Sequence, residues 1–148
     1  MKKRNLFTVL MLIAIVSLTV MALNSCGPKG KNIGLQLYSI RDSINRDVPG
    51  AIAKVAEMGY KFVEPAGYRD GKFYNMEPDA FKALLAENKM TMLSSHTSRN
   101  VPDSTNYDET MAWWDVCIDA HVAAGAKFIV QPSMGRTAYR SLEGLKDY

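Results

Sequence analysis

The sequence predicts an α/β protein with a parallel sheet, and two observations carry this prediction. An apolar run that ends in polar residues occurs four times, at residues 32–40, 61–68, 90–100 and 127–135. The segments between these runs have apolar residues at helical spacing. Because a buried parallel strand needs neighbours that are separated from it by helices, four strand–helix units in a row indicate a parallel sheet with helices packed outside it.

A short sequence that recurs at two predicted helix-to-strand junctions supports this organisation. Gly59-Tyr-Lys-Phe-Val63 and Gly125-Ala-Lys-Phe-Ile129 are nearly the same, and their separation fits two strand–helix–strand units of about 30 residues each. The candidate folds are an eight-stranded barrel and an open, doubly wound sheet. A barrel takes about 250 residues, so we expect residues 32–148 to form the first half of a longer barrel. The alternative is a native half-barrel that pairs with itself, because a half-barrel leaves its first and fourth strands as open edges.

The first two units are assigned as follows. Residues 33–40 are predicted to form a strand and residues 41–47 a polar connection, after which Asp47 caps a helix that ends at Gly59. The second strand contains Phe62-Val63 and reaches Glu64, and a loop rich in glycine and aromatic residues follows. Pro78 opens the next helix. The predicted apolar faces of these two helices comprise Ile52, Val55 and Ala56, and Phe81, Leu84 and Leu85.

The third strand begins at Met90 and ends near His96. Asn106 and Glu109 have the spacing of a capping box, so the third helix should start near Tyr107 and end at Gly125. Its predicted inner face comprises Met111, Trp114, Ile118 and Val122. The fourth strand is predicted at residues 127–130, and Ser141 is the predicted cap of a fourth helix.

Residues 1–26 have the pattern of an export signal. Lys2, Lys3 and Arg4 form a positive segment, and residues 6–22 are apolar apart from three hydroxyl residues. Leu23-Asn-Ser-Cys26 resembles the lipobox of bacterial lipoproteins. We therefore expect an exported protein, anchored in the membrane through lipid on Cys26 and facing the periplasm, with residues 27–31 as a tether. A retained membrane anchor and an ordinary export signal are the alternatives.

The net charge of the chain, +3, comes entirely from that leader, because the remaining residues hold 15 basic and 15 acidic side chains. A neutral body argues against a broad nucleic-acid surface. Since Cys26 is expected to carry lipid, Cys117 is predicted to be a lone buried thiol rather than half of a disulfide.

Polar and aromatic side chains cluster where the predicted strands end. Parallel strand–helix folds bind ligands at the carboxyl ends of their strands. Amides, hydroxyls, an imidazole and a carboxylate together suit a polyhydroxylated ligand, whereas His121 is predicted to be structural. The candidate side chains at the strand ends are Gln36, Tyr38, Glu64, Ser95, His96 and Gln131.

Four segments carry a family resemblance: Ile33-Gly-Leu-Gln-Leu-Tyr-Ser-Ile-Arg41, Gly59-Tyr-Lys-Phe-Val-Glu64, Ser94-Ser-His96 and Gly125-Ala-Lys-Phe-Ile-Val-Gln-Pro132. Together they resemble the sugar phosphate isomerase/epimerase family of xylose-isomerase-like TIM barrels, and in particular its exported lipoprotein members. The resemblance implies a (β/α)8 barrel, here truncated to about its first four strand–helix units.

The resemblance also implies a chemistry. The full-length protein is expected to bind a divalent metal ion (Mn, Mg, Co or Zn) and to move a proton next to a carbonyl group of a sugar or sugar phosphate. The family's metal ligands, two Glu, an Asp and a His, come from later strands, so no metal ligand or catalytic residue is assigned in this chain. Glu64 and His96 match positions on the substrate side, and the chain alone is expected to be inactive.

Two alternatives to the isomerase interpretation remain. The first is a non-catalytic sugar-binding lipoprotein that keeps the strand-end residues without the proton chemistry. The second is a zinc enzyme like the apurinic-site endonucleases, in which His96 would be a zinc ligand. The neutral body and the missing second histidine argue against this nuclease. The predicted partners are therefore a small sugar, a membrane through the lipid anchor and no nucleic acid, and self-association is left open.

Overall fold

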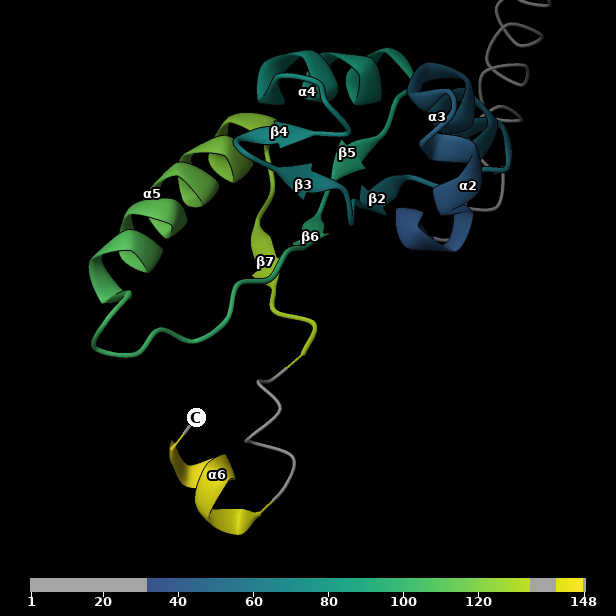
Figure 1. Cartoon of the computed structure of the whole chain (residues 1–148). Helices are drawn as coiled ribbons and strands as arrows, with labels where there is room; N and C mark the ends of the chain where they lie inside the picture. Colours follow the sequence, from purple (N-terminus) through teal and green to yellow (C-terminus); the bar gives the residue numbers. More distant parts are fainter. Residues whose placement is uncertain (1–31, 134–140, 148) are drawn as a thin grey trace, which may run out of the picture. The chain divides into compact units, whose positions relative to one another are not determined.

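The computed structural model describes residues 32–133 and 141–147. It contains part of a TIM barrel, with parallel strands joined by helices (Figure 1). The signal, lipobox and tether predicted for residues 1–31 lie outside the described residues. Within the described residues, no helix is both long enough and apolar enough to cross a membrane.

The first strand is shorter than predicted. β1 covers only Gly34–Gln36, and a 3₁₀ helix, η1 (Leu37–Ile40), and a short helix, α2 (Arg41–Ile44), follow it. The strand predicted over 33–40 and the connection predicted over 41–47 were therefore wrong in detail. The chain turns after Gln36 because Leu37, which is fully buried, packs into the core from the 3₁₀ helix and not from a strand.

The first long helix agrees with the prediction. α3 (Val48–Glu57) starts after Asp47, whose side chain accepts a hydrogen bond from the amide of Gly50 at 3.0 Å. This bond satisfies one of the amides that a helix start leaves without a partner. The helix ends before Gly59, which has a φ of +94°. Its predicted apolar face is confirmed, since Ile52 and Val55 are buried in the core and Ala56 packs against it.

The second strand–helix unit begins with β2 (Phe62–Glu64), which pairs in parallel with β1. The aromatic loop forms an antiparallel hairpin of β3 (Tyr68–Arg69) and β4 (Lys72–Phe73). Helix α4 (Pro78–Glu87) then buries Phe81 and Leu85, with Leu84 partly buried, as predicted.

The third strand position is broken at Leu93. β5 (Thr91–Met92) pairs with β2, whereas β6 (Ser94–His96) pairs with β7 (Phe128–Val130). The backbone of Leu93 joins the two parts, because its amide donates to Val63 and its carbonyl accepts from Lys127. The strand order is therefore β1, β2, β5 with β6, and β7, which is the order of consecutive barrel strands.

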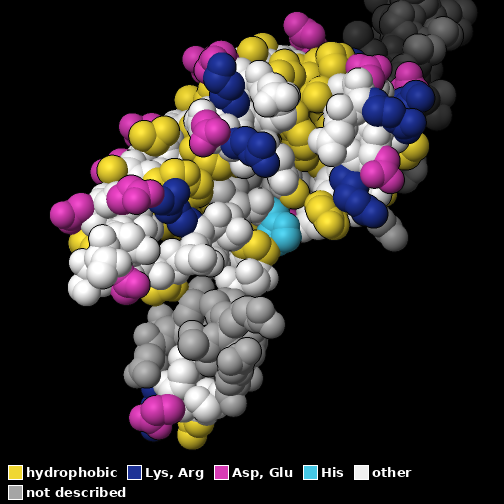
Figure 2. Space-filling view, viewed as in Figure 1, with side chains coloured by type: hydrophobic (Ala, Val, Ile, Leu, Met, Phe, Trp, Pro, Cys, Tyr) yellow, Lys and Arg dark blue, Asp and Glu magenta, His cyan; other side chains and the backbone are white. Residues whose placement is uncertain are grey.

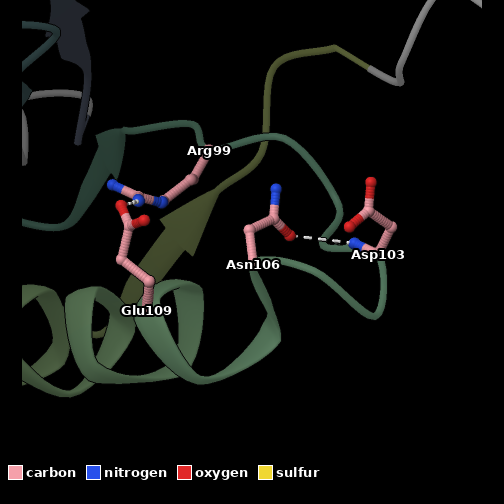
Figure 3. Close-up of polar contacts among 4 residues, drawn as sticks. All are labelled: Arg99, Asp103, Asn106 and Glu109. Atoms are coloured by element: carbon pink, nitrogen blue, oxygen red, sulfur yellow. Dashed lines mark hydrogen bonds and ion pairs between the residues drawn. The ribbon is translucent and has the colours of Figure 1, made fainter.

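Helix α5 (Tyr107–Ala124) starts and ends where the sequence predicts, but its predicted capping box is absent. The side chain of Asn106 accepts from the amide of Asp103 at 2.9 Å and makes no bond to the helix (Figure 3). Glu109 instead pairs with Arg99 at 2.6 Å. The capping-box prediction was wrong because both side chains have closer partners in the loop that precedes the helix.

The inner face of α5 was also predicted wrongly. Ile118 and Val122 are exposed, whereas Cys117 and His121, each one residue earlier, are buried, so the buried face is turned about 100° from the predicted one. Its buried residues are Thr110, Cys117, Ala120, His121 and Ala124.

The core lies between the strands and the helices, which follow one another around one side of the strands (Figure 1). Ser141 accepts from the amide of Gly144 at 3.0 Å at the start of α6 (Leu142–Asp147), so the predicted cap is confirmed. On the face drawn in Figure 2, Lys and Arg side chains are interspersed with Asp and Glu.

Candidate functional site

The candidate site is centred on the carboxylate of Glu64. Gln36 Nε2 donates to Glu64 Oε1 at 2.7 Å, and the hydroxyl of Ser94 donates to Oε2. Gln36 and Glu64 are directly paired in the register of β1 and β2, so their side chains leave the sheet on the same face. Three consecutive strand positions therefore contribute one side chain each to a single hydrogen-bonded cluster.

Glu64 is an ionised acceptor in this cluster. Burial by itself would raise the pKa of Glu64, but the hydrogen bonds from Gln36 and Ser94 and the attraction of the nearby His96 together outweigh it and hold the pKa below its ordinary value. A carboxyl group of this kind is charged at neutral pH. It can accept hydrogen bonds from a ligand, but it is poorly suited to donating a proton.

His96 lies two residues after Ser94 on the same strand, so it shares the face of the cluster. Its backbone amide donates to the carbonyl of Pro65 at 2.8 Å, which ties the end of β6 to the residue after Glu64. Within the described residues no hydrogen bond occupies its half-buried imidazole. The ring is therefore available to a ligand.

An open hollow of about 280 Å³ lies beside the cluster. Its apolar part includes Phe62, whose ring lies so close to Gly34 that a Cβ atom there would be 2.0 Å from it. A hollow lined by both apolar and polar side chains can hold the carbon skeleton of a sugar against the apolar groups and its hydroxyls against the polar ones. The lining residues are Gly34, Leu35, Gln36, Phe62, Glu64, Leu93 and Ser94.

Two predicted site residues lie apart from this cluster. Tyr38 is 56% exposed on η1, with the guanidinium of Arg41 5.0 Å from the centre of its ring. Gln131 holds the loop after β6: its Nε2 donates to the carbonyl of Arg99 at 3.1 Å and its Oε1 accepts from the amide of that residue at 3.3 Å. The structure brings Gln36, Glu64 and His96 together, but it gives Tyr38 and Gln131 other contacts.

Ser95 was predicted at the strand-end site and is on the other face of the sheet. It is fully buried, and its hydroxyl bonds that of Thr97 at 2.8 Å, which in turn contacts Nε2 of His121 at 3.2 Å. Ser94, which the prediction did not assign, takes its place. The signal that could have identified it is the two-residue period of a strand, because Ser94 must share a face with His96.

His121 is structural, as predicted. Its Nδ1 donates to the carbonyl of Cys117 at 2.6 Å, so Nε2 is left as the acceptor for Thr97. Burial lowers the pKa of His121 and raises that of the Cys117 thiol. The buried thiol predicted at Cys117 is confirmed.

The described residues do not provide a metal site. Across residues 32–133 and 141–147, no three His, Cys, Asp or Glu side chains gather closely enough to hold a metal ion. Both carboxylate oxygens of Glu64 already accept hydrogen bonds from Gln36 and Ser94. The divalent metal that the resemblance implies therefore finds no ligand set among them.

Comparison with known proteins gave matches among solved structures alone. Neither a scan against protein-family models nor a search of curated proteins found a match. Two crystal structures of sugar phosphate isomerase/epimerases from Parabacteroides distasonis are similar to this chain. One is 28% identical with a TM-score of 0.65 and is matched by 71% of this chain; the other is 29% identical with a TM-score of 0.66 and is matched by 75%.

This chain spans 42% of the length of each of these two proteins. The fold that this chain shares with them is part of a TIM barrel. In both fold and sequence the chain is similar to the sugar phosphate isomerase/epimerases, and the resemblance first seen in its motifs is confirmed.

Proposed function

We propose that this chain supplies the substrate-binding side of a sugar isomerase or epimerase that moves a proton next to a carbonyl group. The observation that carries the proposal is the cluster of Gln36, Glu64 and Ser94 beside His96, whose imidazole forms no hydrogen bond within the described part of the chain. Its similarity to sugar phosphate isomerase/epimerases of known structure favours a sugar over other polyhydroxylated ligands.

The cluster acts by binding and orienting the sugar. The charged carboxylate of Glu64 accepts hydrogen bonds from sugar hydroxyls, and the amide of Gln36 and the hydroxyl of Ser94 keep the carboxylate fixed. The imidazole of His96 donates to or accepts from a neighbouring sugar oxygen, depending on its tautomer. Because the pKa of Glu64 is lowered and its carboxyl group stays ionised, we assign the proton transfer itself to groups outside this cluster.

We assign the ligands of the expected divalent metal to those groups outside the cluster as well. When bound, such an ion would stabilise the negative charge that develops on the sugar oxygens. The described residues offer it no ligand set. Their share of the reaction is therefore recognition of the sugar.

Sugar binding by the full chain tests the proposal. An aldopentose, an aldohexose and the matching ketoses, each with and without a phosphate group, would be titrated and followed by calorimetry. The Glu64→Gln substitution should lower affinity by about 10- to 100-fold, since it removes a charged hydrogen-bond acceptor. Glu57→Gln is the matched control, because Glu57 is exposed on α3 and should leave affinity unchanged.

A second measurement separates the isomerase from a non-catalytic sugar-binding protein. Exchange of the sugar's C2 proton in D₂O would be followed by NMR in the full-length protein with Mn, Mg, Co or Zn added. Exchange that depends on the metal supports the isomerase. Tight sugar binding without exchange under any of these conditions would favour the binding protein. If no sugar binds, both fail.

We also propose that the protein is exported and carries lipid on Cys26, on the basis of the lipobox-like sequence Leu23-Asn-Ser-Cys26. Labelling cells with a fatty acid that carries a chemical tag should mark the protein, and Cys26→Ala should abolish the label. Cys117→Ala is the control, because that thiol is buried in the folded protein. Full labelling of the Cys26→Ala protein would contradict the proposal.

A further inference from the structure

A series of buried hydroxyl groups connects helix α5 with the end of β2. Nε2 of His121 lies 3.2 Å from the hydroxyl of Thr97, which lies 2.8 Å from the hydroxyl of Ser95. The Ser95 hydroxyl lies 3.5 Å from the carbonyl oxygen of Pro65. All three side chains are buried, so water does not compete for these hydrogen bonds. We call these three side chains, with the carbonyl of Pro65, the buried relay.

The carbonyl of Cys117 determines the direction of each hydrogen bond in the buried relay. That carbonyl can only accept, so Nδ1 of His121, at 2.6 Å, carries a proton, and Nε2 of the neutral ring carries none. Thr97 must then donate to Nε2. Because a hydroxyl has one proton, Ser95 must in turn donate to Thr97. Ser95 therefore has no proton left for the carbonyl of Pro65, which agrees with 3.5 Å, the longest separation in the relay.

A proton on Nε2 of His121 would reverse the buried relay. Both ring nitrogens of an imidazolium are donors, so Nε2 would donate to Thr97 and no longer accept from it. The hydroxyl of Thr97 then turns its proton to Ser95, and Ser95 turns its proton to the carbonyl of Pro65. The added proton comes from the solvent, and only hydroxyl torsions need to change. No hydrogen bond is lost in the reversal, and the bond to Pro65 is gained.

The far end of the buried relay belongs to the backbone of the candidate site. Pro65 directly follows Glu64, and its carbonyl accepts from the amide of His96 at 2.8 Å. A carbonyl oxygen has two lone pairs, so it can accept from Ser95 as well. The relay therefore ends at the backbone bond that ties the strand of Glu64 to the strand of His96.

The other titratable groups near His121 do not change charge between neutral and mildly acidic pH. On its own helix, burial raises the pKa of the Cys117 thiol. On the β3–β4 hairpin, burial raises the pKa of Tyr68, whose ring centre lies 4.8 Å away, to about 12. Helix α4 also packs on α5, and its exposed Lys82 lies beside Gly125, one turn beyond His121. The imidazole is therefore the group of this set that gains a proton as the pH falls.

We propose that the buried relay is a proton-controlled switch, in which protonation of His121 reverses its hydrogen bonds and adds a donor to the carbonyl of Pro65 at the candidate site. Thr97 and Ser95 are positioning residues in this switch, because they act on Glu64 and His96 through the backbone. The switch does not depend on the identity of the ligand.

The neutral direction of the buried relay holds at neutral pH. Burial lowers the pKa of His121, because it disfavours the charged ring. The bond that the reversed relay gains at Pro65 offsets part of this cost, since each donor of the charged ring then has an acceptor. The reversed direction therefore appears as the pH falls below about 6.5, the ordinary pKa of histidine.

The test is an NMR titration of the 148-residue chain between about pH 8 and about pH 4, in a mild detergent that its apolar leader requires. The ring signals of His121 give its midpoint. The carbonyl ¹³C signal of Pro65 should move downfield with the same midpoint, because its oxygen accepts a further hydrogen bond. A Pro65 signal that does not follow His121 would overturn the proposal. Loss of the folded spectrum before His121 is protonated would also overturn it, because the reversed relay would then not exist in the folded protein.

Substitutions within the buried relay separate the switch from the direct field of the charged ring. Ser95→Ala and the nearly isosteric Thr97→Val each remove one hydroxyl, so the Pro65 signal should no longer follow His121. Thr97→Ser keeps the hydroxyl and should keep the coupled shift. Ser98→Ala is the matched control, because Ser98 is an exposed serine of the same loop. Coupling that survives in Ser95→Ala, or that is lost in Ser98→Ala, would contradict the proposal.

His96, the second of the two histidines in the chain, also lies close to Pro65. Its ring signals are recorded in the same titration, and its protonation does not pass through the hydroxyl of Ser95. A shift of the Pro65 signal that follows the midpoint of His96 and persists in Ser95→Ala would assign the effect to His96, and the switch would be wrong. A shift that follows His121 and disappears in Ser95→Ala supports the switch.

Discussion

Gln36 and Glu64 lie 28 residues apart in the chain and share a hydrogen bond of 2.7 Å at the ends of neighbouring strands. The bond joins two side chains that the register of β1 and β2 has already placed opposite each other. It therefore costs little conformational freedom to form, and it fixes one oxygen of the carboxylate at the centre of the candidate site. The second oxygen depends on Ser94.

Replacing Ser94 tests how the charge of Glu64 is held. Ser94→Ala removes a hydrogen bond that lowers the pKa of Glu64, whereas the effect of burial remains. We therefore expect the pKa of Glu64 to rise, as measured by NMR titration of its carboxyl carbon. Ser98→Ala is the control, since Ser98 is exposed in the following loop. An unchanged titration in Ser94→Ala would show that this hydroxyl does not act on the carboxylate.

His121 should make the protein sensitive to acid. Its pKa is lowered in the folded state by burial, so the unfolded chain binds a proton more readily than the folded chain. Stability from the neutral ring is present above the unfolded pKa of about 6.5 and is lost as the pH falls toward the folded pKa. Urea unfolding midpoints should therefore decrease between pH 7 and pH 5, and His121→Gln should flatten that decrease. An equally steep decrease in His121→Gln would assign the acid sensitivity to other groups.

The Asp47 cap should contribute measurably to stability. Asp47→Ala removes the acceptor for the amide of Gly50 and should lower the free energy of unfolding by about 1 kcal/mol. Asp119→Ala is the control, because Asp119 is exposed within α5 and makes no such cap. Urea unfolding of the two variants side by side measures the difference. Equal stability of the two would show that the cap does not contribute.

Gly34 and Phe62 should behave as a coupled pair. A Cβ atom at position 34 would lie 2.0 Å from the ring of Phe62, so Gly34→Ala forces that ring to move. We expect a loss of about 1–3 kcal/mol, as is usual when a packed site is overfilled. Adding Phe62→Leu should recover part of that loss, and a double-mutant cycle measures the coupling. Additive effects would mean that the ring moves aside freely.

Much of the fold followed from local signals. The cap at Asp47 and the stop at Gly125 depend on a few neighbouring residues, which sequence patterns describe well, whereas the start of α5 at Tyr107 was located correctly from a capping box that the structure does not contain. The inner face of α5 could not be predicted from hydropathy. The buried face includes Thr110 and His121, and a buried polar side chain such as His121 depends on partners far away in the chain, here Thr97.

The candidate site was also predicted only in part, because some of its residues follow from general rules of the fold and others depend on contacts outside the strands. Gln36, Glu64 and His96 are strand-end residues of a parallel sheet, and general rules of the fold identify them. Gln131 and Tyr38 also follow strands, but Gln131 bonds to the backbone of Arg99 in another loop and the ring of Tyr38 lies against Arg41. Such contacts depend on loop conformations, which strand patterns do not determine.

The break at Leu93 determines which residues of the third strand face the sugar. Met92 faces the helices, and strict alternation after it would turn Leu93 and Ser95 toward the site and Ser94 and His96 away from it. Because the strand is interrupted, Leu93 and Ser94 both line the hollow, and the alternation then resumes one residue later. An uninterrupted strand with the same sequence would point the imidazole of His96 at the helices. The presence of Ser94 and His96 at the candidate site therefore depends on the irregular backbone of Leu93, whose own side chain is apolar.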